Sequence, residues 1–261
     1  MPQIDVPLVR GRFGATSRPD TWWVQPLAVF LGFATFIVYS SWAAFQADFY
    51  RFGPYISPMY SPELFGSPQA WFGPKPDWFP AFLPFSAAFL ILWMPGGFRF
   101  TCYYYRGAYY KAFWADPPNC AVGEPRKTYL GERSFPLIIQ NIHRYFMYIA
   151  VIFIGLLAKD AWDGFMDWPD GFHVNVGSLV LLLNVILLGS YTFGCHSLRH
   201  LIGGISDIIS KSPVRKKAYD CVSCLNERHM RFAWFSLFWV GFTDLYVRLC
   251  SMGIWTDWRI F

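Results

Sequence analysis

The chain has 261 residues, of which 54% are hydrophobic, 21% aromatic and 15% charged, and its formal net charge is +5 at pH 7. Soluble globular domains carry about 25% charged residues, so this composition excludes an ordinary soluble domain. The basic residues lie in the connections between apolar stretches, which membrane topology alone produces. Their placement therefore argues against nucleic acid as a partner.

Five apolar stretches come close to the roughly 20 residues that a helix needs to cross the hydrocarbon core of a bilayer. None of them shows the alternation of apolar and polar residues that is typical of a barrel strand. We therefore expect an all-α polytopic membrane protein, in which a bundle of five transmembrane helices forms one domain. No cleavable signal peptide is expected, because residues 1–23 lack an apolar core. The predicted spans are about 27–47, 79–100, 137–158, 174–194 and 232–252.

The second predicted span has Pro80 and Pro84 in its first turns, where a helix tolerates proline best. Its aromatic tail, 103–114, is expected to continue the same helix into the membrane interface.

Basic and acidic connections alternate along the chain. Lysine and arginine dominate the N-terminal segment (Arg10, Arg12 and Arg18) and the connections 106–134 and 199–231, whereas 48–78 and the connection after the third span are acidic or balanced. Cytoplasmic connections carry the excess of basic residues, so we place the N-terminus inside and the C-terminus outside. The segments 106–134 and 199–231 are then inner loops. The segment 48–78, rich in proline and aromatic residues, is expected to form an ordered cap at the outer interface.

Ionisable residues are costly inside a membrane, and most of those near the predicted spans gather at the inner edge. In the fifth span, Asp244 and Arg248 are four residues apart and are expected to form a local ion pair. Several polar side chains at the inner edge are too short to extend far into water. A layer of hydrogen-bonding groups at this depth suits an amphipathic ligand that has carbonyl oxygens and an apolar tail. The alternative is that they only anchor helix ends among lipid headgroups. The candidate binding residues are Gln140, His143, Arg144, His196, Ser197, Tyr103 and Tyr105.

Two kinds of bound metal are alternatives. Cys221 and Cys224 form a single CxxC, a weak metal signal without a second pair, although His229, Cys195 and His196 could add ligands. Two stacked haems would need histidine pairs at two depths, and only His173 lies at the outer level. One haem b near the inner face stays open, although we favour its absence. Its candidate ligands are His143, His196, His200 and His229.

Three segments carry a resemblance to a known family: 120–126, 140–145 and 194–204. With the span layout, they make the chain similar to the membrane anchor of succinate:quinone oxidoreductase (complex II), in its actinobacterial, single-chain form. The resemblance implies that the chain docks an iron–sulfur subunit and a flavoprotein subunit on its cytoplasmic side. It further implies that a quinone, expected to be menaquinone, is reduced at the inner edge of the bundle.

The same resemblance implies that flavin and iron–sulfur clusters belong only to the partner subunits. It also implies a multi-pass protein of the bacterial inner membrane, in a complex that can form a higher oligomer.

Three other functions compete with this interpretation. A haem b-bearing cytochrome subunit of another respiratory oxidoreductase would need two histidine pairs and, for nitrate reductase, the opposite orientation. A transporter should have polar groups or broken helices near the midplane, and the sequence Pro95-Gly96-Gly97 is the only candidate break. A plain structural anchor is the third alternative.

The charge alternation predicts the outcome of a topology experiment. A reporter fused after Phe261 should behave as periplasmic, and one inserted near Lys216 should behave as cytoplasmic. Alkaline phosphatase and fluorescent-protein fusions measure the two locations independently. The opposite result at either position would contradict the five-span topology.

Overall fold

The computed structural model describes the chain except for residues 1–12, 81, 83–84, 126–133, 136 and 205–206. Apart from two strands of two residues each, its regular secondary structure is helical, as the sequence predicts. Arg10, Arg12, Pro84 and the basic residues Arg126, Lys127 and Arg133 lie outside the described residues. The elements, with 3-10 helices written η, are α1 (Val24–Gln46), β1 (Arg51–Phe52), β2 (Tyr55–Ile56), α2 (Ala87–Ile91), α3 (Trp93–Thr101), α4 (Tyr103–Ala112), η1 (Leu137–Ile142), α5 (His143–Met166), α6 (Val176–Phe193), α7 (His196–Gly203), η2 (Ile209–Lys211), α8 (Pro213–Glu227) and α9 (His229–Ser251).

Within the described residues, three helical segments are long and apolar enough to cross a membrane: Val24–Gln46, Ile138–Met166 and Val176–Phe193. They correspond to the first, third and fourth predicted spans. Helix α9 matches the fifth and has 23 residues, but it contains Asp244 and Arg248. The crossing of the membrane by α9, and by the region of α2 and α3, stays a prediction.

The second predicted span differs most from the structure. Helical structure begins at Ala87 and not near Phe79, and it is interrupted at Leu92. Pro95 explains the interruption, because proline has no N–H to donate to the carbonyl of Ile91 and its ring crowds that carbonyl. A second break at Cys102, whose backbone is extended, separates α3 from α4. The expectation of one helix continuing from the span through 103–114 was therefore wrong.

The two segments predicted as inner loops are also helical in part. Residues 106–112 belong to α4, and most described residues of 199–231 lie in α7, η2 and α8, with the start of α9 at its end. Pro213 occupies the first turn of α8, where its fixed φ favours helix initiation. Only Arg228 separates α8 from α9.

The chain divides into two compact units. One comprises the described residues up to Thr35 together with Arg99–Asn141, and the other comprises Phe36–Phe98 and Ile142–Phe261. In the first unit, the N-terminal segment pairs with the segment after α4, through a hydrogen bond of 3.1 Å from Gly14 N to Gly123 O. The guanidinium of Arg18 donates to the backbone oxygen of Cys120 at 2.8 Å and also pairs with Asp20.

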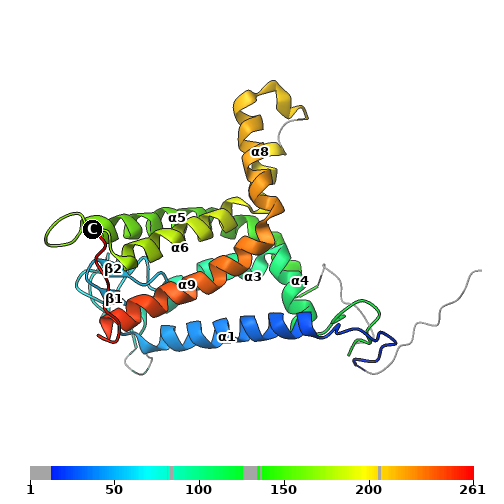
Figure 1. The fold of residues 1–261 in the computed structure, drawn as a ribbon, viewed down its shortest axis with the longest axis horizontal. Coiled ribbons are helices and arrows are strands. Elements are labelled where there is room, and N and C mark those ends of the chain that lie inside the picture. Colours follow the sequence, from blue (N-terminus) through cyan, green and yellow to red (C-terminus); the bar gives the residue numbers. More distant parts are fainter. Residues whose placement is uncertain (1–12, 81, 83–84, 126–133, 136, 205–206) are drawn as a thin grey trace, which may run out of the picture. The chain divides into compact units, whose positions relative to one another are not determined.

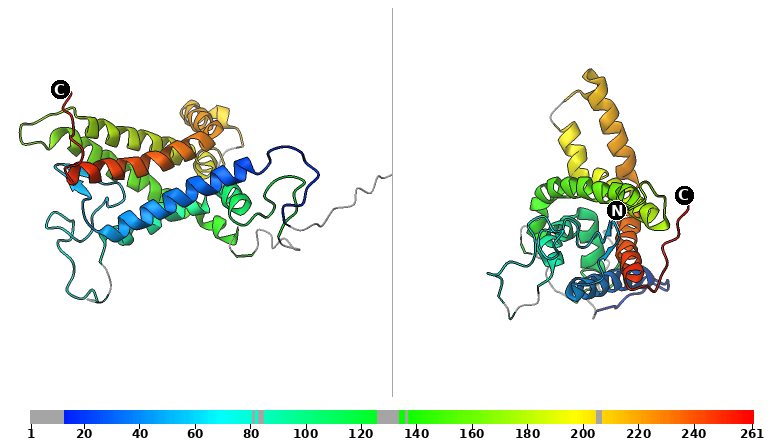
Figure 2. Two further views of the ribbon diagram at one scale, coloured as in Figure 1. Left: turned by 60° about the horizontal axis from the view of Figure 1, so that its bottom comes forward. Right: turned by 90° about the vertical axis from the view of Figure 1, so that its left-hand side faces the viewer.

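In the second unit, α5 packs beside α6 and α6 beside α9, while α8 extends away from these three helices (Figure 1). The chain after α9 returns to the start of α6, as the red tail in Figure 2 shows. There Val174 N donates to Phe261 O at 2.9 Å and Val176 N to Trp258 O at 3.0 Å. The tail thereby satisfies backbone groups near the N-terminus of α6.

The segment after α1 is folded and packs into the second unit. Its hairpin of β1 and β2 places the ring of Tyr55, which is fully buried, against α5 and α6. A side chain at Gly177 would lie 2.4 Å from that ring, and one at Gly164 would lie 3.1 Å from it. The two glycines therefore make room for Tyr55, whose hydroxyl donates to Asp257 at 2.8 Å. Whether this segment caps the outer face stays a prediction.

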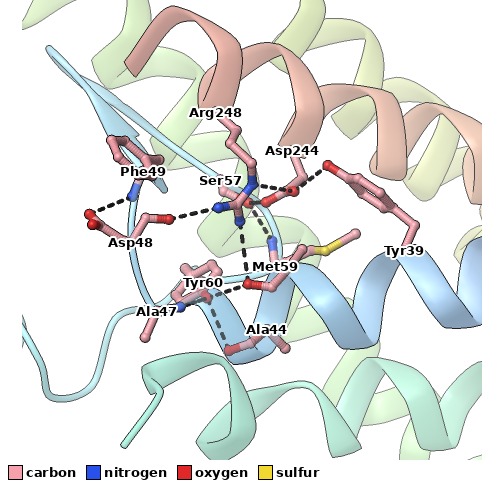
Figure 3. Close-up of polar contacts among 11 residues, drawn as sticks. Tyr39, Ala44, Ala47, Asp48, Phe49, Ser57, Met59, Tyr60, Asp244 and Arg248 are labelled. Atoms are coloured by element: carbon pink, nitrogen blue, oxygen red, sulfur yellow. Dashed lines mark hydrogen bonds and ion pairs between the residues drawn. The ribbon is translucent and has the colours of Figure 1, made fainter. Parts of the chain in front are cut away.

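A buried ion pair links three parts of the second unit (Figure 3). Asp244 and Arg248 of α9 are at most 1% exposed, with Nε of Arg248 3.5 Å from Asp244 Oδ2. The Asp244 carboxylate accepts hydrogen bonds from Tyr39 of α1, at 2.6 Å, and from Ser57. Arg248 donates to the backbone oxygen of Asp48 at 2.7 Å. The predicted local pair is thus confirmed, and it is the centre of a network joining α1, α9 and the segment between α1 and α2.

Removing one member of this pair should destabilise the protein strongly. Arg248→Met leaves the Asp244 charge buried without its partner, a change that costs about 3–5 kcal/mol in proteins. Thermal unfolding of the detergent-solubilised protein measures the effect. Lys216→Met, which removes the exposed pair with Asp220 on α8, is the matched control and should cost less than about 1 kcal/mol. The double variant Asp244→Asn/Arg248→Met should recover part of the loss, and equal effects of Arg248→Met and the control would contradict the assignment.

Candidate functional site

His143 is the first residue of α5 and is buried, although it is a polar side chain at the start of a membrane-length helix. Its Nε2 lies 3.0 Å from Sγ of Cys195, which is also buried. The imidazole stacks on the ring of Phe98, with 4.9 Å between the ring centroids and 10° between the planes. These contacts fix the ring on two sides.

The backbone between α6 and α7 places Cys195 beside His143. Helix α6 ends at Phe193, and the extended backbone of Cys195 precedes α7. Gly194 is required at this break, because a Cβ there would lie 2.8 Å from Ser190 O and 3.1 Å from Leu225 O. The resemblance segment 194–204 therefore includes the turn that directs a thiol at the imidazole.

An aromatic series extends from His143 to a second histidine. Phe98 contacts Tyr191 edge-on at 5.3 Å between centroids, and Tyr191 stacks on His229 at 4.9 Å and 20°. We call His143, Cys195, Phe98, Tyr191 and His229 the His143 cluster. It brings together two of the four histidines predicted for the inner layer. Imidazole and thiol groups exchange protons and can also ligate metals, so His143, Cys195 and His229 are the residues here able to do either.

The other two predicted histidines form a separate, exposed pair. His196 and His200 lie one turn apart on α7, with 2.9 Å between their Nε2 atoms. Partial burial and the nearby positive charge of His200 and Arg199 lower the pKa of His196 from its ordinary value. His196 therefore tends to be neutral and can share one proton with His200. Ser197 follows on α7 and is half-buried, whereas Arg144 on α5 is exposed.

The remaining candidates belong to the first unit. Tyr105 is buried and its hydroxyl accepts a hydrogen bond of 2.6 Å from Arg99. Gln140 donates to the hydroxyl of Tyr109 at 3.1 Å. Tyr103 is 68% exposed, with the guanidinium of Arg106 over its ring at 4.3 Å. Tyr105 and Gln140 are thus held in polar contacts, and Tyr103 is turned to the surface of its unit.

The CxxC cysteines lie on α8 and are both exposed. The sulfur of Cys224 accepts a hydrogen bond of 3.1 Å from Arg228. Among the residues that the structure describes, no group of three or more His, Cys, Asp or Glu side chains around this pair is placed to hold a metal ion. The pair by itself gives two ligands at the surface of a helix.

The sequence did not identify Phe98 and Tyr191 as parts of the site, nor the contact of Cys195 with His143. Tyr191 carries no clear signal, because Cys195 lies beyond the end of α6 and helical spacing does not relate the two residues. Phe98 carries no signal either, because one phenylalanine in an aromatic-rich span resembles any other.

Comparisons with known proteins agree with one another. The family model described as actinobacterial succinate dehydrogenase subunit SdhC matches residues 24–253. A chain in the solved structure of the Mycobacterium smegmatis Sdh1 complex in the apo form is 43% identical, with 94% of each chain covered and a TM-score of 0.86. No curated protein matches the chain.

The geometry around His143 leads to a prediction about haem. Nε2 of His143, the nitrogen that would bind haem iron, lies 3.0 Å from the Cys195 sulfur, and His196 contacts His200. We therefore expect no b-type haem, or at most one, in the purified complex. A reduced-minus-oxidised visible spectrum with a pyridine haemochrome assay measures the haem content. Two haems for each copy of this chain would contradict the prediction.

Proposed function

Because the chain belongs to the family of actinobacterial succinate dehydrogenase SdhC subunits, we propose that it forms the quinone-reduction site of its complex beside the buried His143. Membership makes it a membrane anchor subunit of succinate dehydrogenase, working with the other subunits of that complex. It excludes the haem-bearing cytochrome of a different oxidoreductase and the transporter as the function of this chain.

The overall reaction sets what such a site must provide. Succinate oxidation in a partner subunit yields fumarate, two electrons and two protons, and a quinone takes up two electrons and two protons to become a quinol. The quinone carbonyls need hydrogen-bond donors where negative charge develops, and donors fixed in advance are the most effective. The site therefore needs a polar group that can exchange protons at the edge of the membrane.

The burial of His143 at the first turn of α5 is the observation that carries the proposal. An imidazole has two ring nitrogens that can each donate or accept a hydrogen bond, so histidine is suited to exchange a proton with a bound ligand. The sulfur of Cys195 and the ring of Phe98 hold the imidazole in one orientation. An imidazole held in this way has a defined position before any quinone arrives.

Neighbouring polar residues of the second unit have supporting roles in this proposal. Arg144 is exposed next to His143 and supplies positive charge toward an oxygen at the membrane boundary. His196 and His200 share a hydrogen bond and can pass protons from the aqueous side. Ser197 is a further hydroxyl donor on α7. Gln140, Tyr103 and Tyr105 of the first unit stay candidates for quinone contact, to be tested by their own variants.

We further propose that the iron–sulfur and flavoprotein subunits dock against the basic segments 106–134 and 199–231. In the second segment, Lys216 and Lys217 are exposed on α8, and the guanidinium of Arg199 lies 5.0 Å from the ring centroid of Tyr219. That contact ties α7 to α8 and makes them a defined surface. We also retain five spans with the N-terminus inside, a bacterial inner-membrane location, menaquinone as the quinone and a higher oligomer as features of the proposal.

The test separates quinone reduction from succinate oxidation. His143→Gln in the whole complex should lower the succinate:quinone reductase rate by about 100-fold, the lower range of a general acid–base contribution. Succinate oxidation with a soluble dye should be unchanged, because the dye takes electrons before they reach this chain. His173→Gln is the matched control, because His173 is also buried and also stacks on an aromatic ring, that of Trp168. His173 lies just before the start of α6, whereas Cys195 lies just after its end. Unchanged quinone reduction in His143→Gln would place the site elsewhere.

A further inference from the structure

The segment from Gly66 to Pro74 exposes two large aromatic rings, although it is firmly fixed to the protein. Trp71 is 60% exposed and Phe72 is 66% exposed. We call residues 66–74 the aromatic loop. Exposed rings of this size on an ordered loop indicate a surface that something covers.

The aromatic loop leaves none of its backbone N–H groups unpaired. Seven of its nine residues have an N–H, and each of these donates to a protein oxygen: Gly66 to Gly73, Ser67 to the Glu63 side chain, Gln69 to the Ser67 side chain, Ala70 to Ser67, Trp71 to Glu63, Phe72 to Leu64 and Gly73 to Ala70. The other two residues are Pro68 and Pro74, which have no N–H. A loop facing water has no need of this, because water can accept from free N–H groups. In lipid, each unpaired group costs several kcal/mol.

Buried Glu63 holds the loop in this conformation. Burial tends to raise its pKa, but hydrogen bonds from Arg51, Tyr50 and the backbone of Ser67 outweigh burial and lower the pKa below the ordinary value. The carboxylate therefore stays charged and accepts from Tyr50 at 2.8 Å and from Arg51 Nε at 2.8 Å. Gly66 has φ +143°, and a Cβ there would lie 2.9 Å from Glu63 Oε1, so only glycine fits this approach.

The position and charge of the loop identify its surroundings. The chain leaves the membrane-length helix α1 at Gln46, and Tyr60 hydrogen-bonds to Ala43 O at 2.7 Å, which holds the segment at the end of that helix. From 64 to 85 the only charged residues are Lys75 and Asp77. The Lys75 ammonium lies over the ring of Phe79, 5.1 Å from its centroid, in a cation–π contact that keeps the charge beside aromatic side chains. Tryptophan and lysine together are typical of the boundary between lipid tails and headgroups.

From these observations we propose that the aromatic loop inserts Trp71 and Phe72 into the headgroup–acyl boundary of the bilayer that the anchor occupies. The loop is then a second membrane contact, beside the helices, that fixes the depth of the protein at that end of α1. The satisfied backbone donors allow the insertion, and the glycine and glutamate contacts keep the rings directed outward. This inference depends on the membrane-anchor role and not on the position of the quinone site.

A photoreactive side chain at the loop tip tests the proposal in the whole complex within native membranes. Benzoylphenylalanine replaces Phe72, an exposed residue whose side chain is outside the core, and irradiation is followed by mass spectrometry of the adducts. Val38, 69% exposed on α1, is the matched site for lipid contact, and Val214, 82% exposed on α8, is the matched site away from lipid.

The proposal expects phospholipid adducts at position 72 in a yield similar to that at position 38, and few at position 214. Adducts at position 72 with a second copy of this chain or with another subunit would overturn it, since the loop would then be a protein interface. Lipid adducts at position 38 without any at position 72 would also overturn it, because the loop would then face water. The succinate:quinone reductase rate, measured on each variant, shows that the complex is intact.

Discussion

The buried pair of Asp244 and Arg248 constrains how the second unit can assemble. Two charges without water are tolerable only when each is paired and its remaining hydrogen-bonding capacity is used. Tyr39 and Ser57 supply donors to the carboxylate, and the backbone oxygen of Asp48 accepts from the guanidinium. These partners come from α1 and from the segment after it. Helix α9 can therefore bury its charges only when those parts of the chain are in place, so the pair favours one arrangement of these elements over others.

Interruptions of the helices have a different role, because they direct side chains that a regular helix would place elsewhere. The break at Gly194 and Cys195 turns the thiol toward His143, and the extended backbone at Cys102 ends one helix before α4 begins. Every such break frees backbone groups that must find other partners. At the first break, the side chain of Asn226 donates to Gly194 O at 2.8 Å. Helix α8 thus stabilises the turn on which the His143 cluster depends.

The two ends of the helices of the second unit serve different purposes. One end holds the His143 cluster and the exposed histidine pair, where proton exchange and quinone chemistry are proposed. The other holds Asp257, which accepts hydrogen bonds from Tyr55, Tyr246 and the backbone of Gly177, together with the buried ion pair. The second set is satisfied within the protein and has a structural role.

The sequence by itself determined the membrane class, the helices α1, α5 and α6, and the family resemblance. It could do so because a helix in lipid must be long, apolar and internally hydrogen-bonded, and these are local properties of a segment. It also identified His143 and the Asp244–Arg248 pair, since polar residues are conspicuous in apolar stretches. Only the tertiary structure decided that His143 meets Cys195, 52 residues away, and that Asp244 meets Tyr39, 205 residues away. It also decided the helix break at Cys102. Such contacts depend on which helix faces pack together, and no short window of sequence contains that information.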